Sequence, residues 1–162
     1  MAKKTIKIFL DSNVILSGLF SETGPPRIIL DILCAHIPGV SGVTGHYNLM
    51  EIERNIKKKM PQVYPVYEKY MPLLNLKIIP LPSSDDIQEH SGHVRDKDTP
   101  VIVSALHSGA DYLVTGDKKD FGTLARSRSF TFRIVNPSEM LDIFGRYLGH
   151  TKNPRLLKRE QE

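Results

Sequence analysis

The sequence predicts an α/β fold in which a mostly parallel sheet of about five strands carries helices on both faces. Short apolar runs alternate along the chain with segments whose apolar residues recur at helical spacing. The run Tyr112-Leu113-Val114-Thr115, for example, stops abruptly at Gly116-Asp117, as a buried parallel strand does. At 162 residues, with 40% hydrophobic and 25% charged side chains, the chain suits one globular domain.

The strand predictions rest on these apolar runs. In the first run, Ile6, Ile8 and Leu10 occupy alternate positions, which is the side-chain period of a strand. The second run, Val-Ser-Gly-Val, is short and is a weak strand signal by itself. The predicted strands are residues 5–10, 40–43, 76–81, 112–115 and 130–135.

Helices are predicted between and after the strands. We expect Ser12-Asn13 to cap the first helix, Thr44 the third and Thr99 the fifth, because hydroxyl and amide side chains accept bonds from unpaired backbone N–H groups. Pro65 should bend the fourth helix, and residues 82–97 should form a loop with about one helical turn. The predicted helices are residues 12–19, 26–35, 44–59, 63–74, 99–109, 121–125 and 136–148.

Composition limits the class of protein. Cys34 is the single cysteine, which excludes an intramolecular disulfide and a multi-cysteine metal site. The first apolar run is cut short at Asp11, and no run approaches the length of a membrane span. We therefore expect a soluble, cytoplasmic protein, with one domain over residues 1–148 and a charged tail, 149–162, that is disordered or binds a partner. The net charge of +4 permits a polyanionic partner.

Acidic residues are predicted to meet at one edge of the sheet. Right-handed crossovers place the carboxyl ends of parallel strands together, where ligands commonly bind. Asp11 follows the first strand, Asp117 follows the fourth, and Asp98 precedes the helix that leads into the fourth. On the third helix, Glu51 starts about 3 Å nearer this edge than Glu53. The two glutamates point about 200° apart, so one of them at most faces the site.

Several carboxylates in one place repel each other and tend to protonate unless a cation neutralises them. Mg²⁺ and Mn²⁺ prefer oxygen ligands and are typically held by a few carboxylates together with substrate phosphates. Such an ion lowers the pKa of a bound water and stabilises charge on a phosphate during displacement. The predicted chemistry is therefore metal-dependent phosphodiester hydrolysis.

Four segments resemble the motifs of PIN-domain nucleases. They are Phe9-Leu10-Asp11-Ser12-Asn13-Val14-Ile15, Glu51-Ile52-Glu53, the stretch from Asp96 to Ile102, and the stretch from Gly109 to Phe121. The resemblance spans about residues 5 to 145 in the order of the family. It implies a three-layer α/β/α fold, Mg²⁺- or Mn²⁺-dependent cleavage of RNA, and frequent homodimers. Many bacterial and archaeal members are toxins that pair with an antitoxin protein.

The resemblance also implies roles for individual residues. Asp11, Asp98 and Asp117 match the metal-binding aspartates, and Asp120 matches an auxiliary metal-binding acid three residues beyond Asp117. Glu51 best matches the acid on the third helix. The predicted catalytic residues are Asp11, Glu51, Asp98 and Asp117.

Two of these positions have neighbours that compete for the same role. Asp96 is an alternative to Asp98, and Glu53 is an alternative to Glu51. Asn13 and Thr115 match polar neighbours of the family's site and are predicted to support it.

Basic residues near the acids are candidates for contacts with the RNA backbone. Lys118 and Lys119 are the preferred ones because they lie between Asp117 and Asp120. Lys58 belongs to a basic stretch on the outer face of the third helix and is the other candidate. For each group, an ordinary solvated surface is the competing interpretation.

Two other functions compete with a nuclease. Asp11 followed by Asn13, with Asp117 later in the chain, is similar to the haloacid-dehalogenase phosphatases, although their second acid is replaced here by Asn13. The other alternative is a non-catalytic RNA-binding or regulatory module that keeps the fold.

Overall fold

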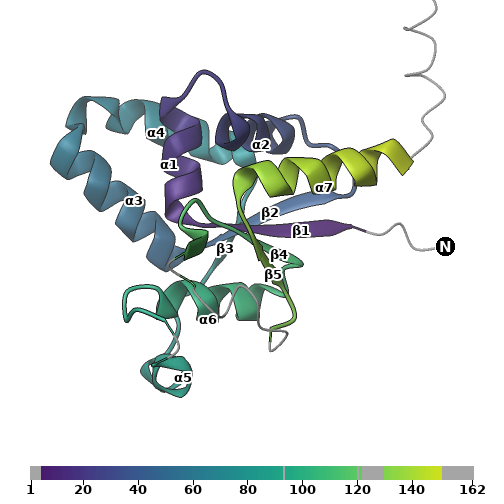
Figure 1. Ribbon diagram of the computed structural model, residues 1–162. Coiled ribbons are helices and arrows are strands. Elements are labelled where there is room, and N and C mark those ends of the chain that lie inside the picture. The colour runs from purple at the N-terminus through teal and green to yellow at the C-terminus, as the bar shows by residue number, and fades with distance from the viewer. Residues whose placement is uncertain (1–4, 93, 120, 122–129, 151–162) are drawn as a thin grey trace, which may run out of the picture.

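The fold is built on a parallel sheet whose first strand lies at its centre. The computed structural model describes residues 5–92, 94–119, 121 and 130–150. Within them, five strands pair in the order β3-β2-β1-β4-β5, and every pairing is parallel (Figure 1). The strands are β1 (Ile6–Leu10), β2 (Val40–Gly45), β3 (Lys77–Ile79), β4 (Tyr112–Val114) and β5 (Arg133–Val135). The predicted parallel sheet is confirmed.

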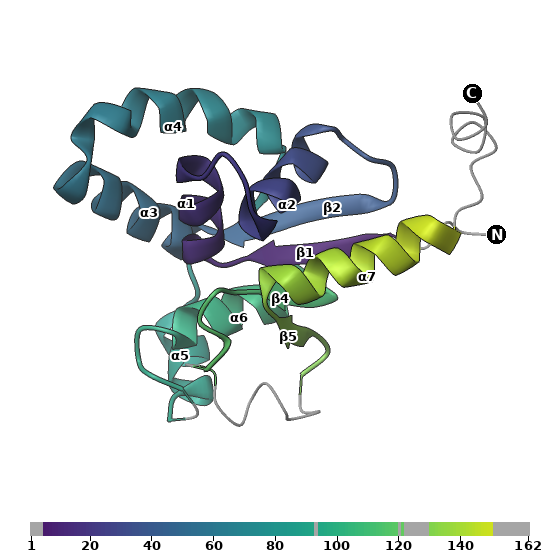
Figure 2. The same cartoon turned by 45° about the horizontal axis from the view of Figure 1, so that its top comes forward.

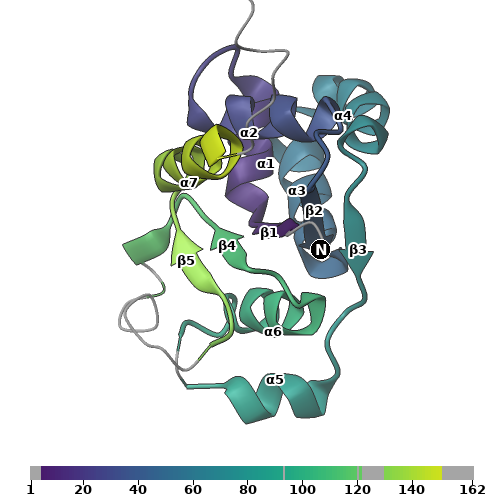
Figure 3. The ribbon, with the colours of Figure 1, turned by 90° about the vertical axis from the view of Figure 1, so that its right-hand side faces the viewer.

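Helices cover both faces of this sheet. Figure 3 shows the strands crossing the middle of the molecule, with α1, α2, α4 and α7 on one side and α5 and α6 on the other, while α3 overlaps the strands in this view. The α-helices are α1 (Ser12–Phe20), α2 (Pro25–Cys34), α3 (His46–Lys59), α4 (Tyr64–Tyr70), α5 (Ser84–His90), α6 (Thr99–Ser108) and α7 (Pro137–His150). The short 3₁₀ segments η1 (Pro61–Val63) and η2 (Met71–Leu74) flank α4. The three-layer α/β/α architecture is therefore confirmed.

Alternation along the strands divides the core into two halves. Ile6, Ile8 and Leu10 of β1 pack with buried residues of α1, α2 and α7. Phe9 faces the opposite way and packs with Val101 and Ala105 of α6, among others. Each such side chain contributes about 1.5–3 kcal/mol when it is fully buried. The two half-cores hold the strand ends in fixed register, which positions the residues that follow them.

The beginning of α1 differs from the expectation. Asp11, rather than Ser12-Asn13, is the N-cap residue, and its carboxylate accepts a 2.8 Å hydrogen bond from the backbone N–H of Ser12. The chain leaves β1 one residue earlier than a cap at Ser12 would require. As a result, Ser12 and Asn13 lie in the first turn of the helix, where their side chains can serve other partners.

The predicted caps of α3 and α6 are also each displaced by one residue. Thr44 lies inside β2, where its hydroxyl donates a 2.8 Å bond to the carbonyl of Leu10, and Gly45 precedes the helix. Thr99 is the first residue of α6, and Asp98 precedes it as the cap residue. The bond from Thr44 to β1 replaces the capping bond that the sequence suggested.

Other boundaries shift for local reasons. Residues 63–74 form α4 between two 3₁₀ segments instead of one bent helix, because prolines recur at positions 61, 65 and 72. Ser83 caps α5 by accepting a bond from Asp86 N, so the expected loop contains a seven-residue helix. At the start of α7, Asn136 and Glu139 form a reciprocal capping box with bonds of 2.8 and 3.1 Å.

The remaining predictions concern the end of the chain and the membrane. Helix α7 continues to His150, beyond the predicted end of the domain at residue 148. Most of the helix predicted at 121–125 and the tail from residue 151 lie outside the described residues. Among the described helices, none combines the length and apolar character that a bilayer crossing requires.

Candidate active site

The candidate site lies where β1 and β4 end side by side. Leu10 pairs with Val114, and the Asp11 N–H donates a 2.9 Å bond to the Val114 carbonyl. Asp11 and Thr115, the residues that follow the two strands, therefore meet. Figure 2 shows the end of β1 leading into α1, with the first turn of α3 beside it. Three elements that are distant in sequence thus surround the Asp11 carboxylate.

Asp11 is held by donors on both of its carboxylate oxygens, and only 7% of the residue is exposed. Oδ1 accepts from Ser12 N at 2.8 Å and from Asn48 Nδ2 at 3.2 Å, while Oδ2 accepts from Thr115 Oγ1 at 2.8 Å. A carboxylate can accept about four such bonds. The three bonds fix its plane and leave acceptor capacity mainly on Oδ2.

The electrostatic environment disfavours the ionised form of Asp11. Burial raises the pKa of its carboxyl from the ordinary 3.8 to about 6, and the negative charges of Glu51 and Asp98 act in the same direction. The hydrogen bonds from Thr115 and Ser12 oppose this shift. Among the described residues, no lysine or arginine forms an ion pair with Asp11. A buried acid beside two like charges is an environment that a cation would stabilise.

A second hydrogen-bond network joins Thr115 to Asp117. Asn13 donates from Nδ2 to Asp117 Oδ2 at 2.8 Å, and its Oδ1 accepts from Gly116 N at 2.9 Å. The Thr115 hydroxyl oxygen also accepts from Asp117 N at 3.1 Å. The two predicted supporting residues, Asn13 and Thr115, thus contact the acids directly. Asp117 itself is exposed, unlike Asp11.

The structure distinguishes Glu51 from Glu53. The charge of Glu51 acts on the Asp11 carboxyl, which places Glu51 on the site-facing side of α3. Glu53 instead accepts a 3.4 Å bond from Tyr67 OH of α4 and lines a groove of about 570 Å³ on that side of the helix. The roughly opposite directions of the two side chains agree with helical geometry.

Asp98 lies at the start of α6 and also acts on Asp11 through its charge. Its Oδ2 accepts a 3.0 Å bond from Arg95 Nε, and its side chain is 15% exposed. Asp96 is exposed in the preceding loop. Of the two competing aspartates, Asp98 is therefore the one whose field reaches the buried carboxylate.

The donor atoms at this end of the sheet are of the kind that a divalent cation binds. Oxygen ligands from carboxylates, a buried acid with no cationic partner among the described residues, and two further negative charges nearby suit a hard divalent cation. In the described part of the chain, however, no three His, Cys, Asp or Glu side chains are grouped closely enough to hold an ion as they stand. Asp120 lies outside the described residues.

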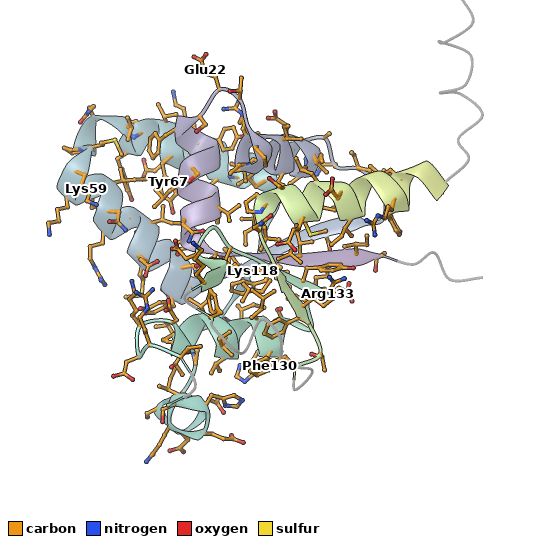
Figure 4. All side chains as sticks on the ribbon, viewed as in Figure 1. Glu22, Lys59, Tyr67, Lys118, Phe130 and Arg133 are labelled. Atoms are coloured by element: carbon orange, nitrogen blue, oxygen red, sulfur yellow. The ribbon has the colours of Figure 1, made fainter. Side chains whose placement is uncertain are left out.

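The predicted RNA-binding lysines occupy different places. Lys118 Nζ lies 3.0 Å from Glu139 Oε1, so it is paired with the capping box of α7. Lys119 is exposed beside it. Lys58 is exposed ten residues beyond Asn48 on α3, which is about 15 Å along the helix axis. Figure 4 shows Lys118 near the centre and Lys59 at the far end of α3, away from Lys118.

Asn48 is a site residue that the sequence analysis missed. It is fully buried and donates to both Asp11 and Ser12. Residues three apart on a helix share a face, so the spacing between Asn48 and Glu51 was the available signal.

Comparisons with known proteins identify the fold. No family model matches the chain, and no curated protein matches it. A chain of the DNA-bound VapBC from Salmonella typhimurium is 16% identical, with a TM-score of 0.58, and the match covers 82% of this chain and 99% of that chain. VapBC-1 from nontypeable Haemophilus influenzae gives 16% identity, a TM-score of 0.56, and 82% and 99% coverage. A chain of a toxin-antitoxin complex from Klebsiella pneumoniae is 22% identical, with a TM-score of 0.54. That match covers 80% of this chain and 97% of the other.

These similarities define the class of fold to which the chain belongs. The order of the sheet, the two helical layers and the solved neighbours together show a PIN-like α/β/α fold. Its structural neighbours are components of toxin-antitoxin complexes. The identities of 16% to 22% make this a likeness of fold.

Proposed function

We propose that the chain is a metal-dependent endoribonuclease that hydrolyses RNA phosphodiester bonds. The observation that carries this proposal is the buried Asp11 carboxylate, which lies within the field of Glu51 and Asp98 at the carboxyl end of β1. A buried acid that has no cationic partner in the described part of the chain is costly to keep ionised in a structural role. A cation that binds during function would offset this cost, and this supports the proposal.

The proposed ligands of Mg²⁺ or Mn²⁺ are Asp11, Asp98, Asp117 and Asp120. When bound, such an ion supplies an activated water and stabilises negative charge on the scissile phosphate. Thr115 holds Oδ2 of Asp11, and Asn13 holds Oδ2 of Asp117, so both carboxylates keep defined orientations. Glu51 is the fourth catalytic acid, and its charge favours cation binding at Asp11.

The proposed RNA contacts follow from charge and exposure. Lys119 is exposed next to Asp117 and Lys118, and can contact phosphates close to the cleavage point. Lys118 would contribute while it remains close to Glu139. Because Lys58 is about 15 Å along α3 from Asn48, it would contact only RNA that extends along that helix.

We further propose that the protein is the toxin of a toxin-antitoxin pair and forms a homodimer. The support for pairing is that the chains with the same fold come from toxin-antitoxin complexes. Growth arrest on expression of the wild type, and no arrest on expression of Asp11→Asn, is the expected result. Size-exclusion chromatography with light scattering tests the dimer.

A phosphatase mechanism is less well supported by the site. A phosphatase of this kind needs a second acid two residues after the nucleophilic aspartate, which would be Asp11 here. The position that would carry the second acid is Asn13, whose amide is bound to Asp117.

The deciding experiment is cleavage of end-labelled RNA with Mg²⁺ or Mn²⁺ by the wild type, Asp11→Asn and Asp117→Asn. Metal-dependent cleavage by the wild type and its loss in both variants is expected. Equal activity in all three proteins would reject the assignment. RNA binding without cleavage would instead favour the non-catalytic module.

A further inference from the structure

Asn48 is a buried amide that the proposed reaction has not used. It lies in the first turn of α3, and none of its surface is exposed. Its Nδ2 donates to Asp11 Oδ1 at 3.2 Å and to Ser12 Oγ at 2.9 Å. The Ser12 hydroxyl in turn donates to the backbone carbonyl of Asn48 at 3.4 Å. The start of α3 is thus tied to the residues that follow β1.

Within the described part of the chain, the other end of the same amide has no hydrogen-bond partner. Asn48 Oδ1 is buried and unpaired, as is the neighbouring Ser104 Oγ of α6. A side chain at Gly45 would place its Cβ only 2.8 Å from Asn48 Oδ1, so glycine leaves room for this carbonyl. An unpaired buried acceptor costs free energy of folding. The amide therefore occupies its position at a cost, which is typical of a functional requirement.

The carboxylate of Asp11 decides which way the amide points. If the amide were turned by about 180°, its oxygen would face Asp11 Oδ1, and two acceptors would repel each other. In the observed orientation, both donors of Nδ2 are used on Asp11 and Ser12. The Asn48 amide and the Asp11 carboxylate thus fix each other's orientation.

We propose that Asn48 is a positioning residue for the candidate metal site. It holds Oδ1 of Asp11 in place, so that the remaining acceptor capacity on Oδ2 is kept for a divalent cation. Ser12 N and Asn48 Nδ2 bind one oxygen, and Thr115 Oγ1 binds the other, so three elements of the fold stop the carboxylate from rotating. This inference rests on the proposed metal-dependent function.

The location of Asn48 gives it a second effect on the same site. Asn48 and Glu51 lie on one face of α3, three residues apart. The bonds from Asn48 to Asp11 and Ser12 therefore also set the distance between the Glu51 charge and the Asp11 carboxylate. Removing the Asn48 amide would therefore free both the Asp11 carboxylate and the start of α3, the helix that carries Glu51.

The test is Mn²⁺ binding by the full chain, measured by isothermal titration calorimetry for the wild type and Asn48→Leu. Leucine has a similar volume and no donor. We expect binding to weaken about 10- to 100-fold, as for other residues that orient metal ligands. If Asn48→Leu does not fold, as judged by circular dichroism, Asn48→Ala takes its place in the same measurement.

Ser104→Ala is the matched control. Ser104 is equally buried and also carries an unpaired oxygen, but it forms no hydrogen bond with Asp11. The Ser104→Ala variant should bind Mn²⁺ with an affinity within about twofold of the wild type, because Ser104 does not orient a metal ligand. A loss of the same size in both variants would mean that general packing is responsible, and would overturn the proposal.

RNA cleavage by the wild type separates this inference from the proposed function. If the wild type binds Mn²⁺ and Asn48→Leu does not, the inference holds even when no RNA is cleaved. If the wild type cleaves RNA and both proteins bind Mn²⁺ equally, the inference is wrong and the function stands. A wild type that binds no Mn²⁺ overturns the inference.

Discussion

Thr115 donates a 2.8 Å hydrogen bond to Asp11 across a sequence separation of 104 residues. Both residues are buried, and each directly follows a strand of the central pair β1 and β4. The Thr115 oxygen also accepts from Asp117 N, so one hydroxyl connects two of the proposed metal ligands. Changes at this hydroxyl should therefore affect stability and activity together.

Thr115→Val keeps the shape of the side chain and removes the donor. We expect it to lower the free energy of unfolding by about 1–3 kcal/mol, because a buried carboxylate oxygen loses its partner. Urea unfolding at pH 7 measures this change. The RNA cleavage rate should fall about tenfold or more, since Asp11 Oδ2 is no longer held.

Thr44→Val is the control for Thr115→Val. The Thr44 hydroxyl is equally buried and also donates a 2.8 Å bond, but to the backbone carbonyl of Leu10. It should lose about 0.5–1.5 kcal/mol of stability while its cleavage rate stays near that of the wild type. Equal losses of activity in the two variants would contradict a special role for Thr115.

The pH dependence of stability should show the buried charge of Asp11. Its folded pKa is raised by burial to about 6, above the ordinary 3.8, so the folded state favours the protonated carboxyl. The stabilising effect of protonation is complete below about pH 4 and is lost as the pH rises through 6. At about 1.4 kcal/mol per pKa unit, the loss is about 2–3 kcal/mol.

Asp11→Asn removes this titration. Urea unfolding without metal, from pH 4 to 8, should show the wild type losing about 2–3 kcal/mol relative to Asp11→Asn as the pH rises. Asp96→Asn, at an exposed position, serves as a control. Its stability should change with pH in parallel with that of the wild type. If the stability of Asp11→Asn changes with pH in parallel with that of the wild type, the pKa of the Asp11 carboxyl is not raised in the folded state.

Glu51→Gln and Glu53→Gln form a matched pair on one helix. Glu51→Gln should reduce RNA cleavage about 10- to 100-fold at saturating Mg²⁺, because it removes an acid from the site. Glu53→Gln should leave cleavage within about twofold of the wild type, since Glu53 faces Tyr67 and α4. The reverse order of effects would place Glu53 in the site.

Asn13→Asp tests how Asp117 is held. The substitution places a carboxylate where the amide now donates a 2.8 Å bond to Asp117, so like charges would replace a donor and an acceptor. We expect RNA cleavage to fall about tenfold or more at pH 7, with part of the loss recovered at lower pH. A gain of phosphatase activity in Asn13→Asp would support the competing mechanism instead.

The two lysine positions should respond to the length of the RNA. In an Asp11→Asn background, Lys119→Gln should weaken binding of both a hexanucleotide and a longer single strand, and lower the salt slope by about 0.7. Lys58→Gln should affect only the longer strand, because Lys58 lies about 15 Å along α3 from Asn48. Fluorescence anisotropy measures both. Loss of hexanucleotide binding in Lys58→Gln would contradict this arrangement.

Much of the fold was predictable because local patterns agree with the tertiary structure. Alternation in Ile6, Ile8 and Leu10 indicated β1, and the Asn136 and Glu139 pair indicated the start of α7. The displaced caps at Asp11 and Asp98 were not predictable, because Ser12 and Thr99 beside them are equally suitable capping residues, and Gly45 offers no capping side chain at all. Which of them caps a helix depends on where the strand before it stops pairing.

The sequence by itself determined the class of fold and the acids at the ends of the strands, since periodicity and chain order are local information. Only the tertiary structure separated Glu51 from Glu53, paired Lys118 with Glu139, and brought Asn48 and Thr115 onto the two oxygens of Asp11. Those contacts join segments up to 104 residues apart. They follow from the order and register of the strands, which no single segment of the chain specifies.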